Sequence, residues 1–204
     1  MKTDKQEISA SELEKEIIDF LTGWASSSGG KNEGLGCNLK HGRASVLATS
    51  YEDVPRATPI DYFSDGTLNV WFNAEPGGKI ANIMRNPNVS VGIFEPVDHT
   101  IDQKSLQLWG KAQIINEKNN AALFLEKWEV FGVSEAVAGM VNSMIHKKMI
   151  PEEAKEKTMK SVQNKINFIK VVPEKIVLRE MPLGQGTHRK IWENGKAWRL
   201  KFEL

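Results

Sequence analysis

The strongest constraint on the fold is a succession of short strand-like segments between residues 43 and 115, separated by turn residues. Short strands joined by tight turns favour an antiparallel barrel or sandwich over a parallel sheet. The chain has no GxGxxG motif after a strand and no P-loop motif, so nucleotide-binding folds of those two kinds lose their main support. The predicted strands cover residues 43–50, 56–63, 68–72, 89–94 and 106–115.

Turn residues predict how these strands are connected. Asp53 and Pro55 indicate a turn after the first strand. The next two strands flank a Ser-Asp-Gly turn, so we predict a β-hairpin over residues 56–72. A short helix is expected over residues 79–85, ended by the Asn-Pro-Asn run that follows it. Gly110 lies inside a strand pattern and indicates a β-bulge.

Helical periodicity appears in two other places. Residues 8–24 read as an N-terminal helix, with Ser9 or Ser11 as its cap. Residues 117–165 form a helical insert, after which strand patterns return over residues 166–181. We therefore expect a single domain over residues 1–204, with a barrel from residues 40–116 and 166–181, and a tail from 182–204 that holds an Asn194–Gly195 turn. The helices of the insert are predicted at 117–130, 134–149 and 151–165.

Composition excludes several classes of protein. The 27 basic and 26 acidic residues leave a net charge of +1, which provides no long-range field to hold nucleic acid or a membrane surface. No stretch of apolar residues is long enough to span a membrane, and the N-terminus does not resemble a signal peptide. The single cysteine, Cys37, rules out an internal disulfide and suits a cytoplasmic protein. The four histidines lack metal-ligand spacing, so no metal site is expected.

Residues 55–87 contain a candidate anion site. Arg56 begins a strand, and its side chain is expected on one face with Thr58. Gly77 and Gly78 allow the backbone to approach a ligand closely, and Lys79 follows at a helix start. Free N–H groups at a helix N-terminus favour a phosphate, and an arginine beside the lysine would complete a two-cation clamp. A surface turn with a solvated lysine is the alternative interpretation.

The order of motifs in this region resembles one known family. An Arg-led strand, an Asp65–Gly66 turn, an aromatic strand ending in Asn73, a loop to Lys79 and a helix ending in Asn86–Pro87 occur in sequence. The strands VSVGIFEP and LQLWGKAQII follow them. Over about residues 40–116 this pattern resembles the pyridoxamine 5′-phosphate oxidase-like family of FMN-binding proteins. The resemblance implies a mainly β fold, a six-stranded antiparallel split β-barrel, with the N-terminal helix and the helical insert added.

The resemblance also implies a cofactor, FMN, at the interface of a homodimer. Arg56 and Lys79 are expected at its phosphate, and the strand residues after Arg56 along the ribityl chain and the ring. Gln107 is expected to reach the cofactor from the partner subunit. The cofactor-binding residues implied are Arg56, Ala57, Thr58, Pro59, Phe72, Asn73, Gly78, Lys79 and Gln107.

Two departures bear on the activity that the resemblance implies. Gly77–Gly78 stands where the oxidase carries Ser-Arg, and the insert over residues 117–165 is not typical of the oxidase. We therefore expect an FMN-dependent oxidoreductase that uses an unidentified small-molecule substrate or electron donor, and these departures argue against pyridoxamine phosphate as its substrate. No residue is assigned as catalytic. The alternative is a non-catalytic flavin-, deazaflavin- or haem-binding module for electron transfer or sensing.

Other polar and aromatic residues carry two interpretations each. Cys37 lies beside Lys40 and His41, which can lower a thiol pKa, but an inert loop residue is the simpler reading. His188 lies among basic residues and is either a ligand contact or a solvated side chain. Two tryptophans, Trp192 and Trp198, flank the Asn-Gly turn of the tail. They form either a lid over a bound ring or an ordinary cross-strand pair.

Overall fold

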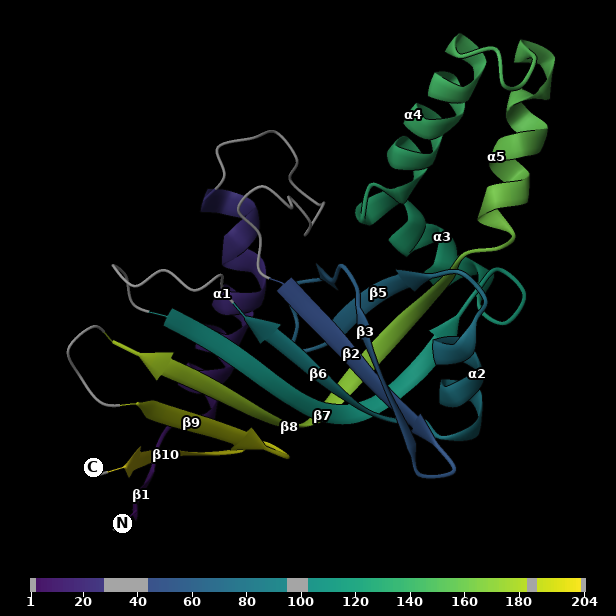
Figure 1. Ribbon diagram of the computed structural model, residues 1–204. Coiled ribbons are helices and arrows are strands. Elements are labelled where there is room, and N and C mark those ends of the chain that lie inside the picture. Colours follow the sequence, from purple (N-terminus) through teal and green to yellow (C-terminus); the bar gives the residue numbers. More distant parts are fainter. Residues whose placement is uncertain (1–2, 28–43, 95–102, 183–186, 203–204) are drawn as a thin grey trace.

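Ten strands join into one sheet in the part of the chain that the computed structural model describes, residues 3–27, 44–94, 103–182 and 187–202. The main path of this sheet is β1-β10-β9-β8-β7-β6-β2-β3, and all of its strand pairs are antiparallel (Figure 1). Because β1 and β3 end this path and do not pair with each other, the sheet remains open there. The predicted fold class, a mainly β antiparallel split barrel with added helices, is confirmed, but the described sheet has ten strands rather than the six expected. The strands are β1 Thr3–Glu7, β2 Ala44–Tyr51, β3 Val54–Pro59, β4 Phe63–Ser64, β5 Val70–Ala74, β6 Asn88–Phe94, β7 Gln103–Ile115, β8 Asn167–Met181, β9 His188–Glu193 and β10 Lys196–Phe202.

The sheet divides along β8. One edge of β8 pairs with β7, whereas the other edge pairs with β5 over residues 167–171 and with β9 over residues 175–180. Between these two segments Pro173, which has no N–H to donate, lies opposite Gly110 at a register shift. A Cβ on Gly110 would come within 2.9 Å of the Cα of Pro173, so glycine allows the two strands to approach this closely. The sheet is irregular at Gly110 as predicted, but the extra residue is Glu174 of β8 rather than Gly110 itself.

The predicted hairpin over residues 56–72 is wrong in its pairing. β3 pairs with β2 through a turn at Glu52 and Asp53, whose φ angles of 49° and 60° suit a type I′ turn. The chain then leaves the sheet after Ile60, whose N–H donates to the carbonyl of Ser45 at 3.2 Å. Only Phe63–Ser64 is left to pair with β5. The physical reason is that two prolines in β3 lack N–H donors and suit an edge strand rather than the middle of a hairpin.

The N-terminal helix α1, Ala10–Ser27, covers one end of the sheet. Ser9 caps it as predicted, because its Oγ accepts from the N–H of Glu12 at 3.4 Å. The apolar face of α1 packs into the main core between the helix and the strands. The α1 side chains buried there are Leu13, Ile17, Phe20 and Leu21.

Charged groups hold α1 against β9. The ammonium of Lys190 lies 2.7 Å from Glu16 and 2.9 Å from Glu180, and Lys104 lies 2.9 Å from the other oxygen of Glu180. Burial opposes the charge of Glu180, but the hydrogen bonds and positive charges of Lys190 and Lys104 outweigh it and lower its pKa to about 2. Burial also opposes the charge of Lys190, yet the two carboxylates raise its pKa.

The helical insert packs on the sheet through a second, aromatic core. It consists of α3 Ala121–Val130, α4 Val133–His146, a 3₁₀ turn η1 Glu152–Ala154 and α5 Lys155–Gln163, close to the predicted helices. Phe131 stacks on Phe63 with ring centroids 4.8 Å apart and lies 5.8 Å from the ring of Trp71. The hairpin of α4 and α5 projects away from the sheet (Figure 1).

A buried ion pair fastens α3 to the turn before β5. The ammonium of Lys127, a residue with 7% of its surface exposed, lies 3.5 Å from Asp65 and 5.1 Å from the ring centroid of Trp71. Asp65 also accepts hydrogen bonds from the indole of Trp71 at 2.8 Å and the hydroxyl of Thr67 at 2.6 Å. Burial works against the charge of Asp65, but these hydrogen bonds and Lys127 lower its pKa.

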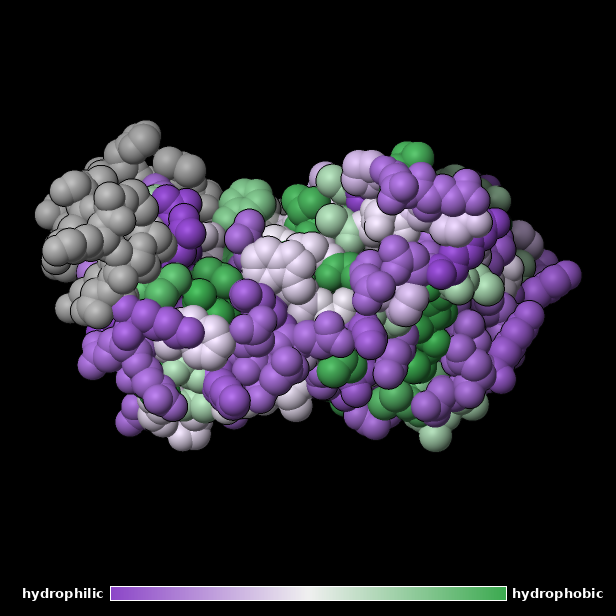
Figure 2. All heavy atoms as spheres, turned by 90° about the horizontal axis from the view of Figure 1, so that it is seen from below, coloured by the Kyte–Doolittle hydropathy of each residue, from purple (hydrophilic) through white to green (hydrophobic). Residues whose placement is uncertain are grey.

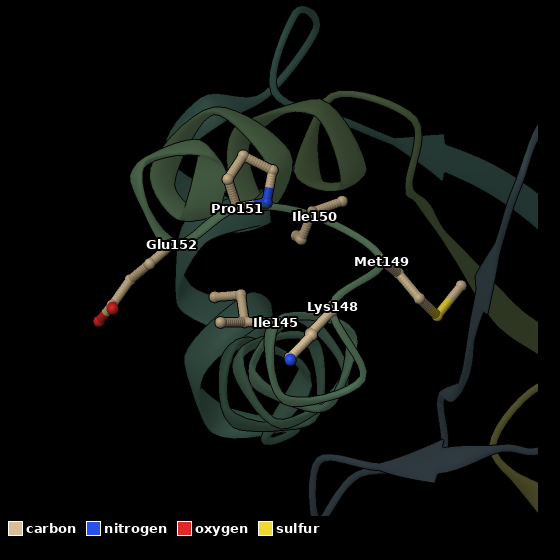
Figure 3. Close-up of a pocket in the computed structure, with 6 residues that line it drawn as sticks. All are labelled: Ile145, Lys148, Met149, Ile150, Pro151 and Glu152. Atoms are coloured by element: carbon tan, nitrogen blue, oxygen red, sulfur yellow. The ribbon is translucent and has the colours of Figure 1, made fainter.

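At the tip of the insert lies a hollow of about 410 Å³ between α4 and η1. Ile145 faces it from α4, with Ile150 and Pro151 on the opposite side, while the carboxylate of Glu152 points away (Figure 3). Its remaining lining residues are Lys148 and Met149. No group of charges converges on this hollow, so it offers packing space rather than a binding site.

The last two described strands form the hairpin predicted for the tail. Asn194 and Gly195 connect β9 to β10 with φ angles of 48° and 78°. Trp192 is buried and its indole N–H donates to Glu14 at 2.6 Å, while the ring of Trp198 lies 4.2 Å from the ammonium of Lys5. Both tryptophans therefore pack within the fold rather than forming a lid. Seen from below, much of the described surface is hydrophilic, and hydrophobic side chains form several separate patches within it (Figure 2).

Candidate functional site

Arg56 reaches across to the first residue of α2, Gly78–Arg85. A Cβ built on Gly78 would lie 2.5 Å from Nη1 of Arg56 and 3.0 Å from its Cζ, so the guanidinium occupies the space that a side chain at position 78 would need. Gly77, by contrast, has nothing within 4 Å of such a Cβ. The strand β3 and the helix α2 therefore meet at Arg56 and Gly78, one residue before Lys79.

The sheet positions α2 through polar contacts along its length. Nδ2 of Asn82 donates to the hydroxyl of Thr49 at 3.1 Å, and Nδ2 of Asn86 donates to the hydroxyl of Ser50 at 3.2 Å. The guanidinium of Arg85 lies 4.6 Å from the ring centroid of Tyr51. These contacts attach α2 to β2, whose neighbour β3 carries Arg56.

The N-terminus of α2 is open to a ligand. No side chain caps it, and its first backbone hydrogen bond joins the N–H of Ala81 to the carbonyl of Gly77 at 3.0 Å. The N–H groups of the first helical turn are free in such a terminus and attract anions. Within the part of the chain that the structure describes, neither Arg56 nor Lys79 has an ion pair or side-chain hydrogen bond. The guanidinium of Arg56 thus lies at this helix terminus, and among the described residues no carboxylate pairs with it.

The sheet register divides the other predicted residues between two faces. Arg56 and Thr58 lie opposite Thr49 and Leu47, which are buried, so they belong to the inner face of the sheet. Ala57 and Pro59 belong to the outer face by the same alternation.

Three predicted residues lie away from the Arg56 side chain or offer little to a ligand. Phe72 is fully buried in the main core, so its side chain is not available to a ligand in this conformation. Asn73 is half-buried on β5, five residues before Gly78. Gln107 lies on the outer face of β7, opposite Gly92, with β6 and β2 between it and β3. Within one chain, Gln107 is therefore not brought to Arg56.

Several residues weighed from the sequence fall outside the described ranges or stand alone. Cys37, His41 and His99 lie outside the described residues. His146 ends α4 and His188 begins β9. Among residues 3–27, 44–94, 103–182 and 187–202, no group of three His, Cys, Asp or Glu side chains could hold a metal ion.

Comparison with known proteins identifies the family. The sequence model described as pyridoxamine 5′-phosphate oxidase matches residues 37–159, more than half of the chain. The chain belongs to this family. A search of curated proteins found no match.

Two solved structures are similar to this chain, and the first of them shows the fold. An FMN-binding, pyridoxamine 5′-phosphate oxidase-related protein of Nostoc punctiforme is 15% identical with a TM-score of 0.54, and the match covers 94% of this chain and 93% of that one. An FAD-binding protein of Mesorhizobium loti is 19% identical with a TM-score of 0.49, over 89% of this chain and 99% of that one. None of the described helices of this family member has the length and apolar character needed to cross a membrane.

Sequence reasoning missed the residues that position α2. Asn82 and Asn86 are four residues apart and therefore share one face of the helix. That spacing was a usable signal, because two amides on one helical face need polar partners when the helix packs on a sheet. Their partners, Thr49 and Ser50, could not be named before the packing of α2 on β2 was known.

Proposed function

We propose that this protein is an FMN-dependent oxidoreductase that acts on a small substrate other than pyridoxamine phosphate. The observation that carries the proposal is the guanidinium of Arg56 at the N-terminus of α2, against Gly78 and beside Lys79 in sequence. Membership of the pyridoxamine 5′-phosphate oxidase family and a fold shared with an FMN-binding protein support it.

The residues at this site suit the phosphate of FMN. A terminal phosphate monoester carries close to two negative charges near neutral pH and has three acceptor oxygens. Arg56 would offer a planar set of donors, Lys79 an ammonium, and the first turn of α2 its free N–H groups. Gly78 leaves the space in which the guanidinium sits. We propose FMN rather than FAD because the clamp suits a terminal dianion.

The other predicted residues would position the rest of the cofactor. Thr58 lies on the same face of β3 as Arg56, and Ala57, Pro59 and Asn73 would contribute mainly backbone groups. Phe72 would support the site from the core, because its side chain is fully buried. When bound, FMN would supply hydride or electron transfer, and the protein would supply binding, orientation and exclusion of water.

The position of Gln107 supports a homodimer. It lies on the outer face of the sheet, away from the inner face that carries Arg56. A contact between Gln107 and the same cofactor would therefore come from a second copy of the chain. An isologous pair with two-fold symmetry is the commonest arrangement of that kind.

Flavin titration of matched variants tests the proposal. We expect Arg56→Ala and Lys79→Ala each to weaken FMN binding by about 1.5–3 kcal/mol, the contribution of a hydrogen bond to a charged group. Lys157→Ala is the control, because it removes an exposed cation from α5 of the helical insert and not from α2 or β3. Unchanged FMN affinity in both test variants would contradict the proposed clamp of Arg56 and Lys79.

The spectrum and the turnover of the purified protein separate the functional alternatives. We expect a flavin absorbance spectrum, reduction by NAD(P)H and turnover of an added electron acceptor. A flavin spectrum without turnover would support the non-catalytic module, and a Soret band would indicate haem instead.

A further inference from the structure

Four residues form two neighbouring contacts between the sheet and α2. Arg56 of β3 and Thr49 of β2 are direct cross-strand partners, so their side chains leave the same face of the sheet about 5 Å apart. On the helix, Gly78 and Asn82 are four residues apart and share one face, about 6 Å apart along the axis. Arg56 meets Gly78, and Thr49 meets Asn82. A second contact therefore lies one helical turn beyond the proposed phosphate clamp.

The two contacts differ in how firmly they fix the helix. Among the described residues the guanidinium of Arg56 has no hydrogen bond to α2, and it is the end of a flexible side chain. By contrast, Nδ2 of Asn82 donates to the hydroxyl of Thr49 at 3.1 Å, and Thr49 has only 3% of its surface exposed. A buried polar group that loses its partner is destabilising, because water does not replace the lost hydrogen bond. The Thr49–Asn82 hydrogen bond therefore opposes a shift of α2 relative to the sheet.

The remaining polar contacts that attach α2 to the sheet, among the described residues, lie in its last turn or just beyond it. Asn86 donates to the hydroxyl of Ser50 at 3.2 Å, and the carbonyl of Pro87 accepts from an N–H of β7 at 2.8 Å. Apolar side chains of α2 also pack into the main core, but such contacts have no preferred direction. Gly78 lies about 12 Å from Asn86 along the helix. A helix held only at this end could pivot and carry its N-terminus away from β3.

We propose that Thr49 and Asn82 are positioning residues for the flavin phosphate. Their hydrogen bond holds the N-terminus of α2 at the distance from β3 at which the guanidinium of Arg56 and the free N–H groups of the helix reach the same phosphate. Neither residue contacts the phosphate itself. The inference rests on the proposed function, because it requires FMN at this helix terminus. The Thr49–Asn82 bond should therefore determine the affinity for the phosphate and not the affinity for the rest of the flavin.

Titration with FMN and with riboflavin separates these two affinities, because riboflavin lacks the phosphate. We expect Thr49→Val, which keeps the shape of the side chain, and Asn82→Leu each to lower FMN affinity about tenfold and to change riboflavin affinity by less than about twofold. The double variant should bind FMN about as well as either single variant, since both substitutions remove the same hydrogen bond. Quenching of flavin fluorescence measures the affinities, and thermal unfolding shows that each variant is folded.

Two matched exchanges serve as comparisons. Ser50→Ala removes the hydroxyl that binds Asn86, at the end of α2 where the contact of Pro87 with β7 remains. Its loss of FMN affinity should be clearly smaller than that of Thr49→Val. Thr158→Val makes the same exchange as Thr49→Val but on α5 of the helical insert, and should leave both flavin affinities as they are.

Three results would overturn the inference. They are an unchanged FMN affinity in Thr49→Val, parallel losses of FMN and riboflavin affinity, and a loss in Ser50→Ala as large as that in Thr49→Val. If Asn82→Leu does not fold, Thr49→Val alone decides. A wild-type protein that binds FMN no more tightly than riboflavin would instead contradict the proposed clamp, before any variant is compared, and one that binds no flavin would remove the proposed function.

Discussion

Two adjacent glycines have different surroundings although they share one loop. A Cβ at position 78 would strike the guanidinium of Arg56, whereas a Cβ at position 77 would meet nothing within 4 Å. Gly77 also has φ 169°, an extended conformation that any residue adopts. The pair therefore allows the contribution of one contact to be measured with a neighbouring position as control.

We expect Gly78→Ala to weaken FMN binding about tenfold and to leave stability nearly unchanged. The new methyl group must displace the end of a flexible side chain, Arg56, rather than backbone, so folding tolerates it. The displaced guanidinium loses a charge-assisted contact with the phosphate, and tenfold corresponds to about 1.4 kcal/mol. Flavin fluorescence titration and thermal unfolding measure the two quantities. Gly77→Ala should match the wild type in both, and an equal loss of affinity in the two variants would show that Arg56 is not involved.

At the scale of elements, the sequence correctly predicted the caps and turns that depend on neighbouring residues. The Ser9 cap, the sheet irregularity at Gly110 and the Asn194–Gly195 turn each depend on a residue type at one position. Strand pairing depends on partners far away in the chain, and there prediction failed for β3. The turn at Asp53 was predicted and is present, but the pairing of β3 with β2 through this turn was not predicted.

The same distinction between local signals and long-range packing applies to the candidate site. Arg56, Gly78 and Lys79 could be named from short motifs and a family resemblance, and the structure brings Arg56 to Gly78. Thr49 and Ser50, the partners of Asn82 and Asn86, could not be foreseen. They depend on the packing of α2 against β2.

The ion-pair network between α1 and the sheet should contribute less to stability at acidic pH. The folded-state pKa of Glu180 is about 2 and its ordinary value is 4.5, so the carboxylate contributes stability fully above pH 4.5 and loses that contribution as pH falls toward 2. Glu180→Gln should lower the free energy of unfolding by roughly 1–3 kcal/mol at pH 7. The difference between wild type and variant should shrink between pH 4.5 and 2.

The stability difference between the wild type and Glu180→Gln is measured from urea unfolding midpoints at pH 7, 4.5 and 3. Glu193→Gln serves as the comparison, because Glu193 forms a more exposed pair with Lys175 at 3.4 Å and its loss should cost little. A difference for Glu180→Gln that is the same at all three pH values would contradict the prediction.

At the scale of the whole molecule, large apolar side chains are exposed at several places among the described residues, Met84 on α2 included, and two of these surfaces are candidates for a dimer interface. One is the outer face of the sheet, where Trp109 is 39% exposed, and the other is the tip of the helical insert, where Met149 is 66% exposed. Only the sheet face also carries Gln107, so a dimer built through that face would complete the proposed flavin site. A dimer built through the insert would leave Gln107 away from any Arg56.

We therefore expect the protein in solution to have twice the chain mass of 22.9 kDa, and Trp109→Glu to reduce it to a monomer. A charge in the middle of an apolar contact must be desolvated without a partner, which destabilises association. The same variant should weaken FMN binding, since each cofactor would lose the contribution of the second copy. Met149→Glu should remain a dimer with wild-type FMN affinity. Light scattering after size exclusion decides between the two surfaces: a monomer produced by Met149→Glu alone would move the interface to the insert and leave Gln107 without a role.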